Sequence, residues 1–487
     1  MKIVGIQPQK IENINIVTRG TIGEPLGLAK ILAIAKEKGH EIKYVPYVDS
    51  VDDLLSDVGT FVPNIALFSI MTSQYPLGEE IATKIKHMFP DIIIVAGGYH
   101  PSSGVLPNYP FDFFVKGEGE IPFELLLMYF QGTGKHVQLN EIPGISYYDE
   151  NNSYRSNPPE RVSDIDSFPL AVRNFSVFQQ KYHSLIYPHY KNQSGFAYIE
   201  YSRGCFNNCS FCCKEAMYGG DKVVFRDPRN VVAEIQSLVE ENVNLLCFVD
   251  LNFTANHKKV FDLCNEIIKS GILISWFCMS NVSTADDADL LRVMSDAGCV
   301  KIMYGVESVS NNIVIDTKKC NNNLYRIMKN TAQAGILCQM LYMIGFSWEK
   351  ESDIYAAVPQ IIQIPAHQIR ISVATPLPGS AWFNETKPED TDWTLYDTEN
   401  LVWNKNNFLD VKDVNSVIKD ICRQFYTTDF YSERINDFLH LHPKYTESFD
   451  YFFNSLVELG ILEENELKVN HITPQKGERY EKLVSFA

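Results

Sequence analysis

The sequence has no hydrophobic run long enough to cross a membrane and no excess of basic residues. None of its apolar stretches reaches the roughly 20 residues that a transmembrane helix needs. The first residues, "MKIVGIQPQK", lack the apolar core and small-residue cleavage site of a signal peptide. The 43 Lys and Arg against 60 Asp and Glu give a net charge of −17, whereas nucleic acids are bound by clustered Lys and Arg. We therefore expect a cytoplasmic protein whose partners include neither a membrane nor a nucleic acid.

The cysteines lack the pattern of a disulfide-bonded secreted protein. Their number, 11, is odd, and most stand singly within apolar runs, as Cys247 and Cys338 do. Buried free thiols of this kind are typical of a reducing compartment. The exception is the segment "GCFNNCSFCC", which holds four thiols within nine residues: Cys205, Cys209, Cys212 and Cys213.

The first third of the chain alternates two kinds of pattern. Its hydrophobic content of 45% and charged content of 21% are globular values, and its 487 residues favour several domains. Over residues 1–145, apolar runs such as "KIVGIQ", "NIALFSIM" and "DIIIVAGG" alternate with amphipathic helical patterns. This alternation predicts an α/β domain of the doubly wound, Rossmann-like type. Residues 146–195 are rich in turn formers and predict a linker or a small hairpin.

The remainder of the chain divides into two further regions. Residues 196–384 contain six strand candidates with helices between them, which predicts a partial (β/α)6 barrel of the TIM type. Ligands bind at the carboxyl ends of the strands in both kinds of sheet. From residue 385 to residue 487 the strand patterns disappear and aromatic-rich amphipathic helices follow. We expect an α-helical C-terminal domain there.

The thiol-rich segment directly follows the first predicted barrel strand. Cys205, Cys209 and Cys212 have the spacing C-x3-C-x2-C. Thiolates are the usual ligands of iron–sulfur clusters, and three of them leave one iron of a [4Fe-4S] cubane open. A zinc site would need a fourth ligand, which Cys213 is badly placed to supply because it adjoins Cys212. Zinc binding, redox use, a disulfide and plain buried thiols stay open as alternatives, and Cys213 is not expected to be a ligand.

This spacing, with an aromatic residue before the third cysteine, resembles the radical S-adenosylmethionine (SAM) superfamily. In that family the open iron binds SAM, and an electron from the cluster cleaves SAM to a 5′-deoxyadenosyl radical. The segments "CFVDLNF", "MYGVES", "CQMLYMIGF" and "VATPLPGSAWF" resemble its later landmarks in the same order. The resemblance implies Cys205, Cys209 and Cys212 as cluster ligands. It implies SAM contacts at Phe211, Asp250, Asn252, Glu307, Ser308, Gln339 and Pro376.

A doubly wound domain before such a core resembles the cobalamin-binding class of the same superfamily. The matching segments are "SIMTSQ", "VAGGYHP" and "VKGEGE". Paired glycines at a strand end suit this ligand, because they let a bulky group approach the backbone. The resemblance implies cobalamin contacts at Ser69, Thr72, Gly97, Gly98, Tyr99, Gly117, Glu118 and Gly119.

Two other motifs bear on the front domain. The rival interpretation, a Rossmann nucleotide site, would need G-x-G-x-x-G after the first strand, and the sequence there does not fit. The Asp-x-His-x-x-Gly motif that supplies a cobalt-ligating histidine in many cobalamin proteins is also missing. We expect a cobalt without a histidine ligand and His100 as an ordinary loop residue.

The two cofactors together imply a reaction. The resemblance predicts a cobalamin-dependent radical SAM methyltransferase, in which the radical abstracts hydrogen from an unactivated carbon and methylcobalamin supplies the methyl group. A non-methylating rearrangement, a cyclisation or a P-methylation uses the same parts, and a cobalamin or metabolite sensor is the non-enzymatic alternative. We expect a small-molecule or peptide substrate and an electron donor such as flavodoxin or ferredoxin. The segments 175–195 and "RQFYTTDFYSERI" are candidates to reach or close the site, although packing alone explains the aromatics of the second segment equally well.

Overall fold

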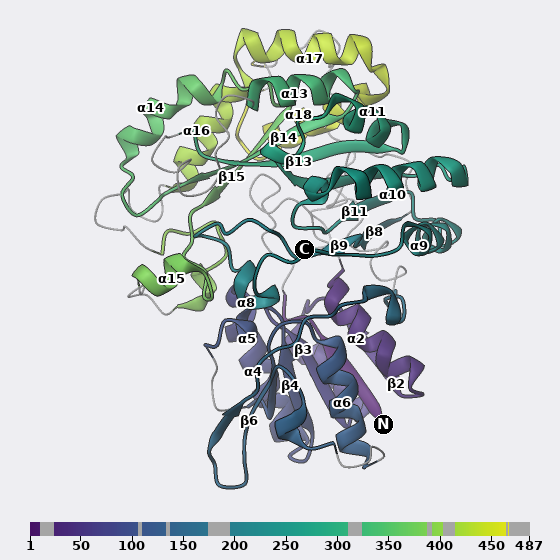
Figure 1. Ribbon diagram of the computed structural model, residues 1–487. Coiled ribbons are helices and arrows are strands. Elements are labelled where there is room, and N and C mark those ends of the chain that lie inside the picture. The colour runs from purple at the N-terminus through teal and green to yellow at the C-terminus, as the bar shows by residue number, and fades with distance from the viewer. Residues whose placement is uncertain are drawn as a thin grey trace.

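The structure is a computed structural model. It describes residues 1–9, 24–105, 110–132, 137–173, 195–309, 324–386, 392–402, 414–463 and 466. Figure 1 shows two sheets, one above the other, with helices around each of them. We call the lower unit, built on β1 to β7, the front domain, and the upper sheet with its helices the barrel.

The front domain has a seven-stranded sheet in the order β2-β1-β3-β4-β5-β6-β7. The order of its first five strands, which are parallel, is the flavodoxin-like doubly wound order, with a switch point between β1 and β3. The predicted doubly wound fold is confirmed. These strands are β1 (Lys2–Ile6), β2 (Glu41–Val45), β3 (Ile65–Ser69), β4 (Ile93–Gly97) and β5 (Phe113–Val115).

Helices cover both faces of this sheet. Apolar residues of α2 and α6 pack on one face, and those of α3 and α4 pack on the other. The helices begin where the residue types require it, as at Ser50, whose hydroxyl accepts a hydrogen bond from the Asp53 amide. Their bounds are α2 (Leu26–Glu37), α3 (Val51–Phe61), α4 (Tyr75–Met88), α5 (Tyr99–Ser102) and α6 (Glu120–Gln131).

The front sheet continues beyond the boundary predicted at residue 145. An antiparallel hairpin of β6 (Ile145–Tyr148) and β7 (Tyr154–Ser156) pairs with the edge of β5. The hairpin predicted within 146–195 is therefore present, and it belongs to the first sheet because its inner residues, such as Tyr147, pack against the domain core. Residues 174–194 of the predicted linker lie outside the described residues.

The barrel has six parallel strands in the order β15-β14-β13-β12-β11-β8. Because β8 and β15 are its two edges, the barrel is open, and the predicted partial (β/α)6 architecture is confirmed. Its strands are β8 (Phe196–Ile199), β11 (Leu245–Phe248), β12 (Ser275–Asn281), β13 (Cys299–Glu307), β14 (Leu337–Ile344) and β15 (Gln368–Val373). The helices on its outer face are α9 (Pro228–Glu240), α10 (His257–Ser270), α11 (Ala288–Asp296), α13 (Leu324–Gln333) and α14 (Glu351–Ile361).

The front domain packs against the inner face of the open barrel. Tyr47, which follows β2, is 6% exposed and lies in one apolar cluster with Phe196, Phe277 and Met303 of the barrel strands. Helix α2 packs against the same face through Leu26. Side chains of the front domain therefore fill part of the interior of the open barrel.

The C-terminal helices pack at the amino ends of the barrel strands. The Tyr426 hydroxyl accepts a hydrogen bond from the Ile369 amide at 2.9 Å, and the Tyr431 hydroxyl donates to the His367 carbonyl at 2.8 Å, both at the start of β15. The aromatics of "RQFYTTDFYSERI" are thus core residues, and the idea that they close a site at the carboxyl ends is wrong. The helices that pack there are α16 (Val414–Tyr426), α17 (Asp429–Leu441) and α18 (Thr446–Glu458), whereas the short helix α15 (Ala381–Thr386) follows the carboxyl end of β15.

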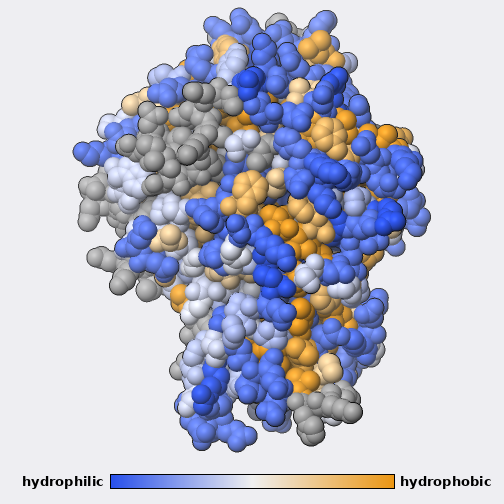
Figure 2. Space-filling model, viewed as in Figure 1, coloured by the Kyte–Doolittle hydropathy of each residue, from blue (hydrophilic) through white to orange (hydrophobic). Residues whose placement is uncertain are grey.

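The surface is mostly hydrophilic on the face shown in Figure 2, where hydrophobic residues run from the barrel across the junction to the front domain. None of the helices that the structure describes combines the length and the apolar composition that a membrane crossing requires.

Candidate functional site

The thiol-bearing loop leaves the barrel after β8 and a short strand, β9 (Ser202–Arg203). Gly204 makes the turn into the loop with a φ of +100°. A side chain at this position would run into the carbonyl oxygen of Lys222, so the sharp turn requires glycine. The loop lies at the carboxyl ends of the barrel strands, as the sequence predicted.

The thiols of the loop differ in burial and in pKa. Cys205 is buried, Cys209 and Cys212 are half-buried, and the Cys212 amide donates to the Cys209 carbonyl at 3.0 Å. Burial raises the pKa of Cys212, and the charges of Cys205 and Glu307 act in the same direction. Burial and the neighbouring Cys212 also raise the pKa of Cys213, to about 12.

This donor set suits a cluster better than a single metal ion. In the part of the chain that the structure describes, no three His, Cys, Asp or Glu side chains converge as one ion would require. Three thiols on one tight loop fit separate corners of a cubane, where each thiolate binds a different iron. The positive charge of bound iron would also offset the raised pKa of Cys212, since metals favour the thiolate.

The loop is held by the ends of β14 and β15. Phe211, a predicted SAM contact, lies with its ring centroid 5.6 Å from that of Trp382. The Trp382 amide donates to the Ser210 carbonyl at 3.1 Å, and its indole packs against Phe346 at 5.5 Å. These contacts fix the middle of the thiol-bearing loop against the barrel.

Two predicted SAM residues accept hydrogen bonds that link the carboxyl ends of neighbouring barrel strands. Asp250, just after β11, is 1% exposed and accepts hydrogen bonds from the Tyr201 amide at 3.0 Å and from the Ser202 hydroxyl. Burial raises the pKa of this carboxyl to about 6. Asn252 accepts from the Asn281 amide at 3.0 Å and so joins the ends of β11 and β12. Direct contact of either residue with SAM stays a prediction.

The other predicted SAM residues lie at different depths. Glu307 ends β13 in a left-handed conformation with a φ of +65°, next to an irregularity in the pairing with β14, and such backbone strain clusters at functional sites. Ser308 is buried and hydrogen-bonds the Tyr342 side chain, and Pro376 is buried in the loop after β15. Gln339 lies deeper, near the amino end of β14.

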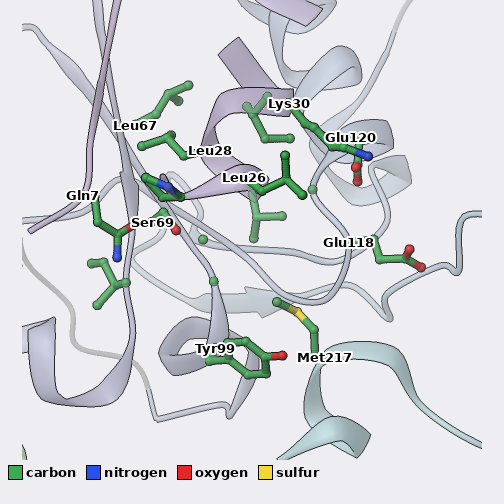
Figure 3. Close-up of a pocket in the computed structure, with 18 of the residues that line it drawn as sticks. Gln7, Leu26, Leu28, Lys30, Leu67, Ser69, Tyr99, Glu118, Glu120 and Met217 are labelled. Carbon is green, nitrogen blue, oxygen red and sulfur yellow. The ribbon is translucent and has the colours of Figure 1, made fainter. Parts of the chain in front are cut away.

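A cavity of about 570 Å³ lies between the front domain and the barrel (Figure 3). It opens at the carboxyl ends of β1, β3, β4 and β5, at the switch point where ligands bind in such folds. Helix α8 (Lys214–Tyr218), which directly follows the thiols, contributes Met217 and Tyr218 to its wall. Seven of the eight predicted cobalamin residues line it: Ser69, Gly97, Gly98, Tyr99, Gly117, Glu118 and Gly119.

Gly98 shows why small residues are needed in this wall. Its φ is +103°, and an added Cβ would lie 2.8 Å from the carbonyl oxygen and 2.9 Å from the amide nitrogen of Ile70. The end of β4 therefore touches the end of β3 directly. Any larger residue would push the two strand ends apart and reshape the cavity.

Thr72, the eighth predicted residue, points elsewhere. Its hydroxyl is 3.4 Å from Nδ1 of His100, which is 2% exposed, stacks on Tyr75 at 4.6 Å and meets Trp393 edge-on at 5.3 Å. Burial lowers the pKa of His100 to about 4. His100 is thus a core residue in α5 rather than a loop residue, and it does not line the cavity.

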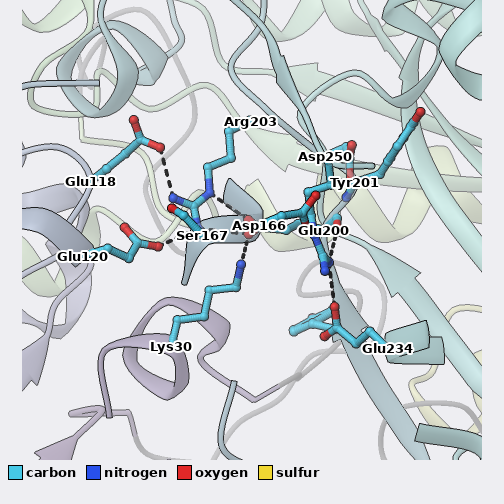
Figure 4. Close-up of polar contacts among 12 residues, drawn as sticks. Lys30, Glu118, Glu120, Asp166, Ser167, Glu200, Tyr201, Arg203, Glu234 and Asp250 are labelled. Atoms are coloured by element: carbon cyan, nitrogen blue, oxygen red, sulfur yellow. Dashed lines mark hydrogen bonds and ion pairs between the residues drawn. The ribbon is translucent and has the colours of Figure 1, made fainter. Parts of the chain in front are cut away.

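A buried network of charges, which the sequence did not reveal, joins the front domain to the barrel at the cavity (Figure 4). Arg203 donates to Glu118 at 3.0 Å, to Glu120 at 2.6 Å and to both oxygens of Glu200 at 2.9 Å. Lys30 pairs with Glu200. Despite burial, the neighbouring carboxylates raise the pKa of Arg203, and Arg203 lowers the pKa of Glu120. Each unit therefore supplies a buried cation that pairs with carboxylates of the other unit.

Two family models match the chain, one on each side of this cavity. The B12 binding domain matches residues 12–127, and the Radical SAM superfamily matches residues 199–356. The chain is a cobalamin-binding radical SAM enzyme. The resemblance predicted from the sequence is confirmed, and so are the [4Fe-4S] cluster, SAM and cobalamin as its cofactors.

Individual relatives agree with this assignment. The enzyme is 26% identical over 445 residues to an uncharacterized methyltransferase of Pyrococcus horikoshii, covering 88% of this chain and 92% of the relative. It is 24% identical over 399 residues to an anaerobic magnesium-protoporphyrin IX monomethyl ester cyclase of a Synechocystis species, covering 78% and 76%. Its fold matches the cobalamin-dependent SAM radical enzyme OxsB with aqua-cobalamin bound, with a TM-score of 0.68, 14% identity and coverage of 100% and 83%.

Proposed function

We propose that this enzyme transfers methyl groups to an unactivated carbon of a small-molecule or peptide substrate. The observation that carries the proposal is the shared wall of the cavity: Met217 and Tyr218 of the thiol-bearing segment face the glycines that end β4 and follow β5. One cavity wall thus belongs to the cluster loop and the opposite wall to the B12 binding domain. A group held in the cavity lies next to a group held by the cysteines.

The residues position and shield these groups. Cobalamin can carry a methyl group, and the cluster with SAM can generate a radical. Cys205, Cys209 and Cys212 would hold the cluster. Leu26 and Leu67 give the cavity an apolar lining that excludes water, which protects reactive species from side reactions.

Cyclisation or another non-methylating rearrangement is the second candidate, favoured by the similarity to the anaerobic cyclase. The methyltransferase of Pyrococcus horikoshii supports methyl transfer more strongly, because that similarity extends over more of both chains. For the electron, we propose a low-potential protein such as flavodoxin or ferredoxin. We place the enzyme in the cytoplasm, since the ten cysteines in the described segments are all free thiols.

An experiment without the substrate separates the two candidates. The full chain, reconstituted anaerobically with iron, sulfide and hydroxocobalamin, is reduced and incubated with SAM that carries a deuterated methyl group. Methyl transfer predicts 5′-deoxyadenosine together with the deuterated methyl on cobalamin, both read by mass spectrometry. Formation of 5′-deoxyadenosine with no label on cobalamin would contradict methyl transfer and favour the rearrangement.

A further inference from the structure

Among the described residues that line the cavity, one side chain has a buried polar atom without a hydrogen-bond partner. Gln7, which follows β1, is 5% exposed and lines the cavity on the same wall as Ser69 (Figure 3). Its Oε1 is buried, and within the described part of the chain it accepts no hydrogen bond. Among the described residues that line this cavity, no other buried side-chain nitrogen or oxygen is left in this state. A buried acceptor without a donor is destabilising, so this position favours a ligand that supplies one.

The hydrogen bond of a backbone amide shows that the unpaired atom of Gln7 is the oxygen, which is an acceptor. Met71 donates its N–H to Gln74 Oε1 at 3.0 Å. Because a backbone N–H can only donate, this contact fixes which end of the Gln74 amide is oxygen. Gln74 Nε2 then donates to Gln9 Oε1 at 3.2 Å, and Gln7 Nε2 donates to Gln74 Oε1. The oxygen of Gln7 is therefore the free end of this chain of amides.

Because this acceptor is unpaired, the ligand group that contacts it should be a hydrogen-bond donor. Phosphodiesters and ionised carboxylates present only acceptors at neutral pH and would be repelled. The charged groups at the junction with the barrel are already paired, since Arg203 donates to both Glu118 and Glu120. What the Gln7 position fits is a neutral N–H or O–H donor.

We infer that Gln7 Oε1 accepts a hydrogen bond from a primary carboxamide on the rim of the corrin ring. The inference rests on the proposed cobalamin site and adds a selectivity to it. Corrins carry such carboxamides around their edge, and each presents N–H groups. Gln7 thereby selects a fully amidated corrin over one in which the facing amide is replaced by a carboxylate.

The test compares ligands that differ by one amide. Binding of hydroxocobalamin and of its b-, d- and e-monocarboxylic acids to the full-length reconstituted protein is followed through the corrin absorbance. We expect one of the acids to bind about tenfold more weakly than hydroxocobalamin. Gln7→Met keeps the volume of the side chain and removes the acceptor. The ratio of the affinity for hydroxocobalamin to the affinity for that acid should therefore fall close to one.

Gln9→Met is the matched control. Gln9 lines the same cavity and belongs to the same chain of amides, but its oxygen is already bonded to Gln74. The amide-to-acid ratio should therefore stay at the wild-type value in this variant. Since the readout is a ratio of affinities, a variant that folds less completely lowers both affinities alike and leaves the ratio interpretable.

Cobinamide, which keeps the carboxamides and lacks the nucleotide, identifies the source of the donor. If Gln7→Met changes the ratio of hydroxocobalamin to cobinamide and leaves the amide-to-acid ratio intact, the donor belongs to the nucleotide and the inference is overturned. Equal ratios in wild type and Gln7→Met overturn it as well. Failure of the wild-type protein to bind hydroxocobalamin is a separate result, because it refutes the proposed function itself.

Discussion

Arg203 of the barrel and Glu118 of the front domain, 85 residues apart in sequence, lie 3.0 Å apart in a buried ion pair. The same guanidinium also holds Glu120 and Glu200, so every carboxylate to which it bonds is buried. Arg203 is therefore one of the side chains that hold the two cofactor-bearing halves together, beside the Lys30–Glu200 pair and the apolar cluster around Tyr47.

Replacing Arg203 by Met should destabilise the protein strongly. The change removes the guanidinium that three buried carboxylates share, and breaking a buried pair in this way costs about 3 to 5 kcal/mol. Urea unfolding of the purified protein measures the loss. Arg229→Met is the matched control, because the Arg229–Asp227 pair is solvent-exposed and should contribute nothing measurable. Equal midpoints for the two variants would show that the buried network carries no stability.

The four neighbouring thiols should differ in function. Cys205→Ala, Cys209→Ala and Cys212→Ala should each lose the iron–sulfur absorbance and the cleavage of SAM, because each removes a cluster ligand. Cys213→Ala should keep both. Iron content and 5′-deoxyadenosine yield after anaerobic reconstitution provide the measurement. A cluster lost on substitution of Cys213 would refute its status as a bystander.

Gly98→Ala should abolish cobalamin binding. The added Cβ would lie 2.8 Å from the Ile70 carbonyl, and the φ of +103° disfavours any side chain. Gly104→Ala separates the two effects, since Gly104 also has a positive φ, +82°, but an added Cβ there meets no atom within 4 Å. We expect Gly104→Ala to lower stability slightly and to leave the bound cobalamin spectrum unchanged. Loss of cobalamin in both variants would mean that backbone strain, rather than the shape of the cavity wall, decides binding.

His100 should make stability depend on pH below neutrality. Burial lowers its pKa to about 4, and the unfolded chain titrates near 6.5. The unfolded state therefore binds the proton first as the pH falls, and stability decreases. Between pH 7 and pH 5 this group alone should remove about 2 kcal/mol. Urea unfolding at the two pH values should give a smaller difference for His100→Gln than for wild type, and an equal difference would contradict the assignment.

The local parts of this structure follow from local sequence. The β-branched run at Ile93–Gly97 and the alternation after it predict a buried parallel strand, and Asp227 followed by Pro228 predicts the start of α9. The Asp227 carboxylate does accept from the Arg229 amide there. The spacing of Cys205, Cys209 and Cys212 is local in the same sense, because three thiols on one short segment can bind one cluster.

The structural features that the sequence did not predict depend on contacts between distant segments. Lys30 and Glu200 pair although 170 residues separate them, and no local pattern marks either residue as buried. The sequence did not show that the Thr72 side chain lies beside His100, because in the first turn after β3 one residue decides whether a side chain faces the cavity or the core. Gln7 carries no motif, and its vacant oxygen becomes visible only when its neighbours are placed.

Tyr47 has a consequence for any attempt to divide this enzyme. The front domain inserts this side chain among Phe196, Phe277 and Met303 of the barrel, so a fragment starting near residue 196 would present those apolar residues to water. Such a fragment would aggregate or collapse. The cluster-binding half thus depends on its neighbour for solubility, and truncation cannot yield a stand-alone SAM-cleaving catalyst from this chain.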